Sequence, residues 1–308
     1  MDLRVVEIFC DVAQRRSFSR GAAVHDVSQS WASQAVHALE ERLGTQLIDR
    51  SKRPLVLTPA GQLYFDGCRE VLGKYREVED QVRQLQDRIE GVVRVAAIYS
   101  VGLMQMDRYL RRFEELYPRA QVRLEYLHPD QVYQQVQLDA ADMGFVSFPR
   151  HSNDIECIDW QVQPIVLVAA PGHRLAGRSE IPLTELAGES FIAFTPELQI
   201  RREIDRWLKR AHVEVSIVHE FDNTETIKRV VEYGSGVALL PGPTVRREVE
   251  AGTLISIPLN DPRLVRPLGI VHKRTRRLSI AAQKWIELIQ QDADTFPVPE
   301  VTQVKARS

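Results

Sequence analysis

The chain has 308 residues, of which 44% are hydrophobic and 27% charged, ordinary values for a globular protein with a sizeable core. Its formal net charge of −2 excludes a uniformly basic nucleic-acid binder, so any such role needs a local basic patch. No apolar run approaches the roughly 20 residues of a membrane span, and the N-terminus lacks the features of a signal peptide. We therefore expect a cytoplasmic protein without membrane contact. Its three cysteines form no CxxC pair, which argues against a disulfide framework and a zinc site.

Residues 1–58 predict small helices followed by a hairpin. Asp2 is placed to cap a first helix, and Ser17 or Ser19 to cap a short second one. Ser28 and Gly44 bound a third helix, "QSWASQAVHALEERL". Two helices joined by a tight turn are typical of a helix-turn-helix. The segment "QLIDRSKRPLVLT" then predicts a hairpin with a basic tip, arranged as a wing.

The third helix has one apolar face and one polar face that carries almost no charge before Glu40. A solvated surface helix is the alternative explanation, but such helices usually carry Lys and Glu. Ser, Gln and His side chains are able to reach base edges and phosphates, and cations on either side of a groove neutralise phosphates. We therefore expect DNA contacts from Arg20, Ser28, Gln29, Ser30, Ser33, Gln34 and His37, and from Arg50, Lys52 and Arg53 of the wing.

Thr58 and Pro59 predict the start of a long helix that runs to Gly91. Its apolar residues recur at alternating steps of 4 and 3, the period of a coiled-coil seam. Because a helix of about 30 residues with one seam needs a partner, we interpret residues 59–90 as a linker through which two chains dimerise. The seam consists of Tyr64, Cys68, Val71, Tyr75, Val78, Val82, Leu85 and Ile89.

From residue 91 to residue 308, short apolar strands alternate with helices, which predicts an α/β domain with a largely parallel sheet. This segment is long for one sheet, so we expect two lobes. Lobe I comprises about 91–163 and 268–308, and lobe II about 164–267. Helices are expected near 198–211, 224–233, 243–250 and 279–292, and the tail 295–308 is expected to be loose.

Three strand-to-helix turns, "YSVG", "FTPELQIRR" and "DNTETIK", carry hydroxyl or amide groups. Such turns aim backbone N–H groups into a crevice at the carboxyl ends of strands. Taken alone, each of Ser100, Thr195 and Asn223 is explained as a plain helix cap, but together they favour a site for a small anion or polar metabolite. The expected contacts are Ser100, Val101, Gly102, Thr195, Asn223 and Thr224, with Ser147 weaker, and Arg201 and Arg202 are candidates to add charge.

Signals for an enzyme are poor. The histidines show neither HxH nor HExxH spacing, "GSGVALLPG" lacks the Lys-Ser/Thr of a phosphate loop, and no GxSxG elbow occurs. We expect no catalytic residues, no metal site and no cofactor. The expected ligand is a small-molecule effector, with an anionic metabolite as one candidate.

The segment "SFSRGAAVHDVSQSWASQAVHALEERLGTQLIDRSKRPLVLTPAG" resembles the winged helix-turn-helix of LysR-type transcriptional regulators. The resemblance is specific over residues 1 to about 90 and continues more weakly through "FEELYP", "LVAAPGHRLAG" and "YGSGVALLPG". It implies a homodimer or homotetramer that binds double-stranded DNA, a two-lobed effector domain like type 2 periplasmic binding proteins, and RNA polymerase as an open possibility for a partner.

Several positions depart from the family pattern. His25 stands where Leu is usual, Ser30 and Trp31 replace Pro-Ala, and Gln34 stands where Arg is frequent. The last two changes bear on the base preference and not on the binding mode.

We therefore predict a ligand-responsive DNA-binding regulator that acts as a dimer of dimers. By analogy with the family, closure of the two lobes on a ligand would reset the spacing between dimers. One alternative is a solute-binding or enzymatic α/β protein whose N-terminal segment serves only assembly, against which the wing and the polar face argue. Another is a constitutive regulator that senses no metabolite.

Overall fold

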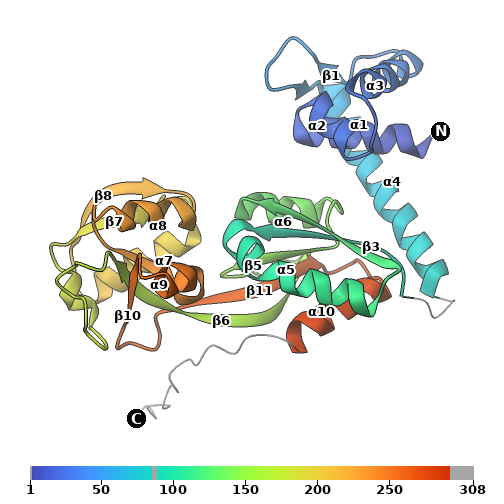
Figure 1. Ribbon diagram of the computed structural model, residues 1–308. Helices are drawn as coiled ribbons and strands as arrows, with labels where there is room; N and C mark the ends of the chain where they lie inside the picture. Colours follow the sequence, from blue (N-terminus) through green and yellow to red (C-terminus); the bar gives the residue numbers. More distant parts are fainter. Residues whose placement is uncertain (1, 85–88, 292–308) are drawn as a thin grey trace, which may run out of the picture. The chain divides into compact units, whose positions relative to one another are not determined.

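The computed structural model describes residues 2–84 and 89–291. The chain divides into an N-terminal unit, which ends before residue 89 and includes 138–140, and a C-terminal unit with the remainder. Figure 1 shows the helices and strands of both units. The seam residue Leu85 and the predicted loose tail 295–308 lie outside the described residues. Within the described ranges, every helix is too short or too polar to span a bilayer.

Three capped helices form the predicted helix-turn-helix. The side chain of Asp2 caps the first helix, Ser17 rather than Ser19 caps the second, and Ser28 caps the third, each by accepting a hydrogen bond from a backbone N–H group. Gly44 ends the third helix with φ of 67°, in the left-handed region that glycine adopts without strain. The helices are α1 (Leu3–Arg15), α2 (Phe18–Ala23) and α3 (Gln29–Leu43).

The apolar face of α3 is seated in a small core of its own unit. Ala32, Val36 and Leu39 are buried together with apolar residues of α1 and α2. Leu43, the last residue of the apolar face, is 40% exposed. The predicted division of α3 into a buried and an open face is therefore confirmed.

The wing and the long helix meet at one glycine. A Cβ on Gly61 would lie 1.9 Å from the carbonyl oxygen of Leu47, so only a residue without a side chain allows this approach. The hydroxyl of Thr58 accepts a hydrogen bond from the N–H of Gly61 at 2.9 Å and caps the helix. The wing is an antiparallel pair of β1 (Ile48–Asp49) and β2 (Val56–Leu57), and α4 (Pro59–Gln84) follows it.

The predicted seam of α4 divides into two parts. Tyr64 and Cys68 pack with the core of the helix-turn-helix, beside Phe65 and Leu72, which do not belong to the 3.5-residue pattern. The next four residues of the seam are uncovered in the single chain, whereas its last residue, Ile89, is partly buried against the core of lobe I. The helix does not reach Gly91 as predicted, because residues 89 and 90 are not helical and Gly91 begins a strand. Four uncovered residues, each between 46% and 54% exposed, form a row that we call the open seam: Val71, Tyr75, Val78 and Val82.

The main sheet of the C-terminal unit is mixed, so the prediction of a largely parallel sheet is wrong. Strand β3 runs parallel to β4 and β5, as in βα repeats, but β6 and β11 run antiparallel to their neighbours. The order is β10-β6-β11-β5-β3-β4, with β9 also paired to β6. The strands are β3 (Gly91–Ile98), β4 (Ala120–Leu127), β5 (Met143–Ser147), β6 (Ile155–Ala169), β9 (Ala238–Pro241), β10 (Ile255–Pro258) and β11 (Val265–Lys273).

Two separate hydrophobic cores confirm the predicted two-lobed organisation. One core includes buried residues of β3, β4 and β5 with the fully buried Trp285, and the other includes those of β7, β9, α7 and α8. Strand β6 contributes to both cores, because its first half packs in one and its second half in the other. The remaining elements are α5 (Tyr99–Leu116), α6 (Pro129–Gln137) and α10 (Ile280–Gln291) of lobe I, and η1 (Leu183–Leu186), β7 (Ser190–Phe194), α7 (Gln199–Arg210), β8 (Ser216–Phe221), α8 (Thr224–Glu232), η2 (Gly242–Val245) and α9 (Arg246–Glu250) of lobe II.

The contact at Gly61 generates the first prediction. We expect Gly61→Ala to lower the free energy of unfolding of the N-terminal unit by roughly 1–3 kcal/mol, because the new methyl group forces α4 away from the wing. Gly67→Ala on the same helix is the matched control, since a Cβ there meets nothing within 4 Å. It should stabilise the helix by roughly 0.5–1 kcal/mol. Urea unfolding of the full chain followed by circular dichroism measures both, and equal effects of the two changes would contradict the prediction.

Candidate functional site

The polar face of α3 is open to solvent over nearly its whole length. Ser33 is half-buried because Nη1 of Arg50 donates a hydrogen bond to its hydroxyl at 3.3 Å. His37 is exposed, with Nε2 at 3.4 Å from the carboxylate of Glu41. The other predicted DNA contacts on α2, α3 and the cap before α3 are also exposed: Arg20, Ser28, Gln29, Ser30 and Gln34. The helix therefore presents uncharged donors and acceptors to solvent.

Glu40 lies inside the N-terminal unit, although its place at the end of the polar face suggests exposure. Its side chain is 7% exposed and accepts hydrogen bonds from the N–H groups of Leu47 at 2.9 Å and Ile48 at 3.1 Å. Its second carboxylate oxygen pairs with Nη2 of Arg50 at 2.9 Å. One carboxylate thus bonds the last turns of α3 to the first strand of the wing. It sets the position of the wing relative to the polar face.

The three cations of the wing differ in their partners within the protein. Arg50 is tied to Glu40 and so serves the structure of the wing as well as its charge. Lys52 is exposed at the tip, with Nζ at 3.9 Å from the carboxylate of Asp49. Arg53 is also exposed and donates to backbone carbonyl groups of the tip at 3.0 and 3.2 Å. Arg50 is therefore the wing cation that is tied to the buried carboxylate, and Lys52 and Arg53 lie exposed at the tip.

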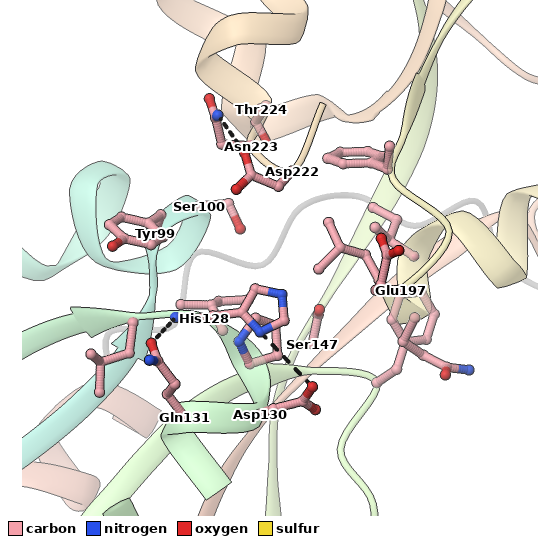
Figure 2. Close-up of a pocket in the computed structure, with 18 of the residues that line it drawn as sticks. Tyr99, Ser100, His128, Asp130, Gln131, Ser147, Glu197, Asp222, Asn223 and Thr224 are labelled. Atoms are coloured by element: carbon pink, nitrogen blue, oxygen red, sulfur yellow. Dashed lines mark hydrogen bonds and ion pairs between the residues drawn. The ribbon is translucent and has the colours of Figure 1, made fainter. Parts of the chain in front are cut away.

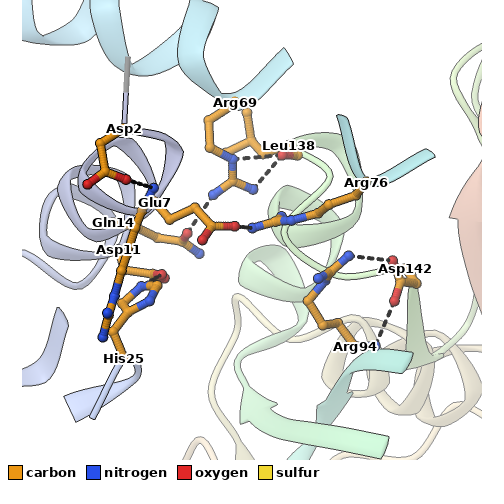
Figure 3. Close-up of polar contacts among 11 residues, drawn as sticks. Asp2, Glu7, Asp11, Gln14, His25, Arg69, Arg76, Arg94, Leu138 and Asp142 are labelled. Carbon is orange, nitrogen blue, oxygen red and sulfur yellow. Dashed lines mark hydrogen bonds and ion pairs between the residues drawn. The ribbon is translucent and has the colours of Figure 1, made fainter. Parts of the chain in front are cut away.

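Two residues that depart from the resembled pattern make contacts of their own. Nε2 of His25 lies 2.6 Å from the carboxylate of Asp11, so a polar pair takes the place of an apolar contact inside the helix-turn-helix (Figure 3). Trp31 is 40% exposed beside the polar face, and the guanidinium of Arg4 lies 5.7 Å from its ring centroid. Trp31 thus adds an apolar ring to this surface, and the cationic side chain of Arg4 lies against that ring.

Polar contacts also join α4 to α1. Nη2 of Arg76 donates to the carboxylate of Glu7 at 2.9 Å, and Nη1 of Arg69 donates to Oε1 of Gln14 at 2.7 Å (Figure 3). Burial lowers the pKa of Arg69 from its usual range, chiefly because the charged form is desolvated. These contacts couple the direction of α4 to the helix-turn-helix that α1 and α3 build.

A cavity of about 460 Å³ lies between the two lobes of the C-terminal unit. Its volume falls within the range of small-molecule sites, and its walls include the starts of α5, α6, α7 and α8. Figure 2 shows Asp222 and Asn223 together on one side of the cavity, with His128 and Asp130 on the opposite side. The cavity therefore brings polar groups of both lobes toward one space.

The cavity wall collects only some of the predicted effector contacts. Asn223 caps α8 and also lines the cavity, so the structural and the ligand-binding explanations of this residue both apply. Val101 is buried in the first turn of α5, and Thr195 follows β7; neither belongs to the described cavity wall. Gly102 lies in the same turn of α5, and the structure does not describe its surroundings. The predicted residues that line the cavity are Ser100, Ser147, Asn223 and Thr224.

Arg266 also lines this cavity and was not among the expected contacts. It is 2% exposed, on β11, and its Nη1 donates to the hydroxyl of Ser100 at 2.9 Å. Its Nε donates to Oε1 of Gln163 on β6 at 3.1 Å. Desolvation by burial lowers the pKa of this guanidinium to about 9, which keeps it charged at neutral pH. The available signal in the sequence is an arginine within a strand that is otherwise apolar, "RPLGIV".

The two arginines of α7 that were candidates for added charge do not line the cavity in the described residues. Arg201 is buried and pairs with the carboxylates of Asp205 at 2.8 Å and Glu220 at 2.6 Å. Arg202 is exposed and donates to the carbonyl of Pro196 at 3.4 Å. Their charges serve lobe II itself.

Two family models match the chain. The bacterial regulatory helix-turn-helix protein model of the lysR family matches residues 3–62, and the LysR substrate binding domain model matches residues 86–294. The uncharacterized HTH-type transcriptional regulator YeiE of Escherichia coli K12 is 29% identical over 285 residues, which cover 92% of this chain and 96% of that protein.

The fold of the chain is also similar to those of solved structures. Full-length CbnR complexed with its target DNA is similar with a TM-score of 0.66 at 19% identity, covering 94% of this chain and 99% of that chain. The regulatory domain of CcmR from Synechocystis PCC6803, in complex with 2-PG, is similar with a TM-score of 0.61 at 25% identity, covering 67% of this chain and 98% of that chain.

The buried carboxylate generates the second prediction. We expect Glu40→Gln to lower the opening free energy of the Leu47 and Ile48 amides by roughly 1–3 kcal/mol, because Arg50 loses its counter-ion and both backbone N–H groups lose a charged acceptor. Glu41→Gln is the control, since that side chain is 70% exposed one residue away. Hydrogen exchange of peptides spanning residues 44–58 measures the change. Unaltered exchange in the Glu40 variant would show that the wing is held by other contacts.

Proposed function

The chain belongs to the LysR family of transcriptional regulators, DNA-binding proteins and not enzymes, and on that premise we propose how this member binds DNA, assembles and responds to a small molecule. The observation that carries the proposal is the uncovered, uncharged polar face of α3, tied through Glu40 to an exposed basic wing. Hydrogen-bonding side chains suit base edges, and the cations beside them suit phosphates.

In the proposed mode, residues 1–58 form the DNA-binding domain and α3 enters a major groove. The wing reaches the backbone or the minor groove on one side, with Arg50, Lys52 and Arg53 near phosphates. Arg20 and Ser28 lie toward the backbone at the start of the recognition helix. The structural neighbour CbnR, crystallised with its target DNA, supports this docking for a chain of the same fold. The side chains that we propose for the base edges are Gln29, Ser30, Ser33, Gln34 and His37.

We propose that two chains pair through the linker 59–90, along the open seam of α4. Apolar residues at steps of 4, 3 and 4 that are about half exposed in the single chain are those expected to be covered by a second helix. Pairing of this kind presents two recognition helices to half-sites one helical turn, or a multiple of it, apart. Two dimers then form a tetramer, as the family resemblance implies.

The domain 91–308 would hold the effector in the cavity between its lobes, with Ser100, Ser147, Asn223 and Thr224 as proposed contacts. A ligand alters DNA binding only if it binds one arrangement of the assembly better than another, and here closure of the lobes would reset the spacing between dimers. The neighbour CcmR regulatory domain, solved with 2-PG, supports a small polar or anionic ligand. Action in the cytoplasm, where the DNA is, belongs to the same proposal, and contact with RNA polymerase stays a prediction.

The test of DNA binding is a gel shift over genomic fragments with a salt titration. We expect sequence-selective binding that weakens as salt rises. Gln29→Ala should cost roughly 1–3 kcal/mol on the preferred fragment and little on others, because it removes a base contact. Lys52→Ala should weaken binding to all fragments and reduce the salt slope by about 1, because it removes a phosphate contact.

Gln62→Ala, at an exposed glutamine of α4 outside the proposed DNA contacts, is the control for these two changes. Binding without sequence preference, or binding that is insensitive to salt, would overturn the regulator mechanism. Equal losses on every fragment for Gln29→Ala would remove that residue from base recognition.

The open seam generates a further prediction. Val78→Asp should raise the dimer dissociation constant on the order of 100-fold, because pairing would bury a carboxylate in an apolar interface. Leu63→Asp makes a comparable change on the same helix at a residue that is 79% exposed and off the seam, and it should leave the dimer intact. Sedimentation velocity over a concentration series distinguishes them. Dimers of unchanged affinity in the Val78 variant would place the interface elsewhere.

A further inference from the structure

The cavity between the lobes has a buried positive charge without a negative partner. Arg266 is 2% exposed, and within the described residues it makes hydrogen bonds only to the neutral side chains of Gln163 and Ser100. The other buried cations of this unit are paired: Arg201 with Asp205, and Lys228 with Glu248 at 2.8 Å. A guanidinium has five N–H donors, so these three hydrogen bonds leave donors for a further acceptor.

Burial of an unpaired cation is unfavourable, because desolvation of its charge is not offset by an opposite charge. The lowered pKa of Arg266 expresses that cost. An anionic group that entered the cavity beside this guanidinium would supply the missing charge. The start of α5, whose first N–H groups have no side-chain cap, lies in the same wall and favours an anion as well.

The same wall carries carboxylates that lack a basic partner. Asp222, at the start of α8, accepts a hydrogen bond from Asn223 only, and Glu197, before α7, has no ion pair within the described part of the chain. Both are exposed to the cavity side of lobe II, which Figure 2 shows for the two labelled residues. A cationic group held between the lobes would satisfy them.

The remaining charges of the wall do not favour one sign. Asp130 is 83% exposed and lies 4.0 Å from His128, and Glu225 shares Lys228 with Glu248. Arg150 is exposed at the cavity and donates to Oε1 of Gln199. The wall thus carries charges of both signs, with Arg266 and Arg150 among the cations and Asp222 and Glu197 among the carboxylates. A dianion would meet Asp222 and Glu197, and a simple cation would meet Arg266.

We propose that the effector is a small zwitterion, such as an amino acid, whose anionic group binds beside Arg266 and Ser100 and whose ammonium group faces Asp222 and Glu197. This inference rests on the proposed function, because it names the chemical class of the molecule that the interlobe cavity senses. The volume of about 460 Å³ accommodates a molecule of that size together with ordered water.

The experiment is a thermal-shift screen of the full-length protein against the twenty L-amino acids at millimolar concentration, followed by calorimetry. Each stabilising amino acid is compared with two probes of the same skeleton, the acid without its amino group and the amine without its carboxyl group. We expect the amino acid to bind at least tenfold more tightly than either probe.

Variants test which residues bind the anionic group and which bind the ammonium group of the ligand. Arg266→Gln should weaken binding of the stabilising amino acid by roughly 10- to 100-fold, and Arg263→Gln, an exposed arginine three residues away, should not. Asp222→Asn and Glu197→Gln are surface changes that leave folding intact, and each should weaken binding about threefold. They should leave binding of the acid lacking the amino group unchanged or strengthened. Glu250→Gln, an exposed carboxylate of α9 outside the cavity, is their control.

The proposal is overturned if no amino acid stabilises the protein, if the acid without the amino group binds as tightly, or if the Asp222 and Glu197 variants bind the zwitterion as the original protein does. A gel shift on the same preparation distinguishes failure of the zwitterion proposal from failure of the proposed function. Salt-sensitive, sequence-selective DNA binding together with any of these outcomes rejects the zwitterion and keeps the regulator, whereas loss of selective DNA binding rejects the function on which it rests.

Discussion

The antiparallel pairing of β6 with β11 is the constraint on which the C-terminal unit depends. The paired stretch runs from Val265 opposite Pro164 to Lys273 opposite Ile155, and it passes from one hydrophobic core to the other. Its register sets Arg266 opposite Gln163, so backbone hydrogen bonds position both the arginine of the cavity wall and the buried side chain to which it donates. Any change in the distance between the lobes has to bend or twist these two strands.

Two buried ions, one in each unit, illustrate opposite uses of the same physics. Glu40 has a complete set of partners, two backbone N–H groups and one guanidinium, and a satisfied network of this kind fixes geometry. Arg266 has neutral partners only, so its network is completed by whatever enters the cavity. Rigid placement of the wing follows from the first case, and sensitivity to a ligand follows from the second.

The features that local rules control were predictable from the sequence. The caps at Ser28 and Gly44, the two faces of α3 and the alternation of strands and helices depend on neighbours within a few residues. The direction of β6 and β11 was not predictable, because alternation alone does not say whether a strand returns the chain to a lobe already begun. Its first half, "IECIDWQVQ", is also broken by polar residues, which hid it among loops.

The missed site residues share one cause. Glu40 bonds to backbone groups of the wing, and Arg266 bonds to a side chain 103 positions away in the chain. Such partners become visible only when the fold is known, whereas charge alone suggests exposure for both residues.

The open seam on α4 also determines how DNA binding depends on the amount of protein. Pairing through the open seam is second order in the concentration of the chain. The occupancy of a DNA site with two half-sites would therefore rise faster than in proportion to the amount of protein. In the proposed mode, the abundance of the regulator is then a second input to the promoter, independent of the effector.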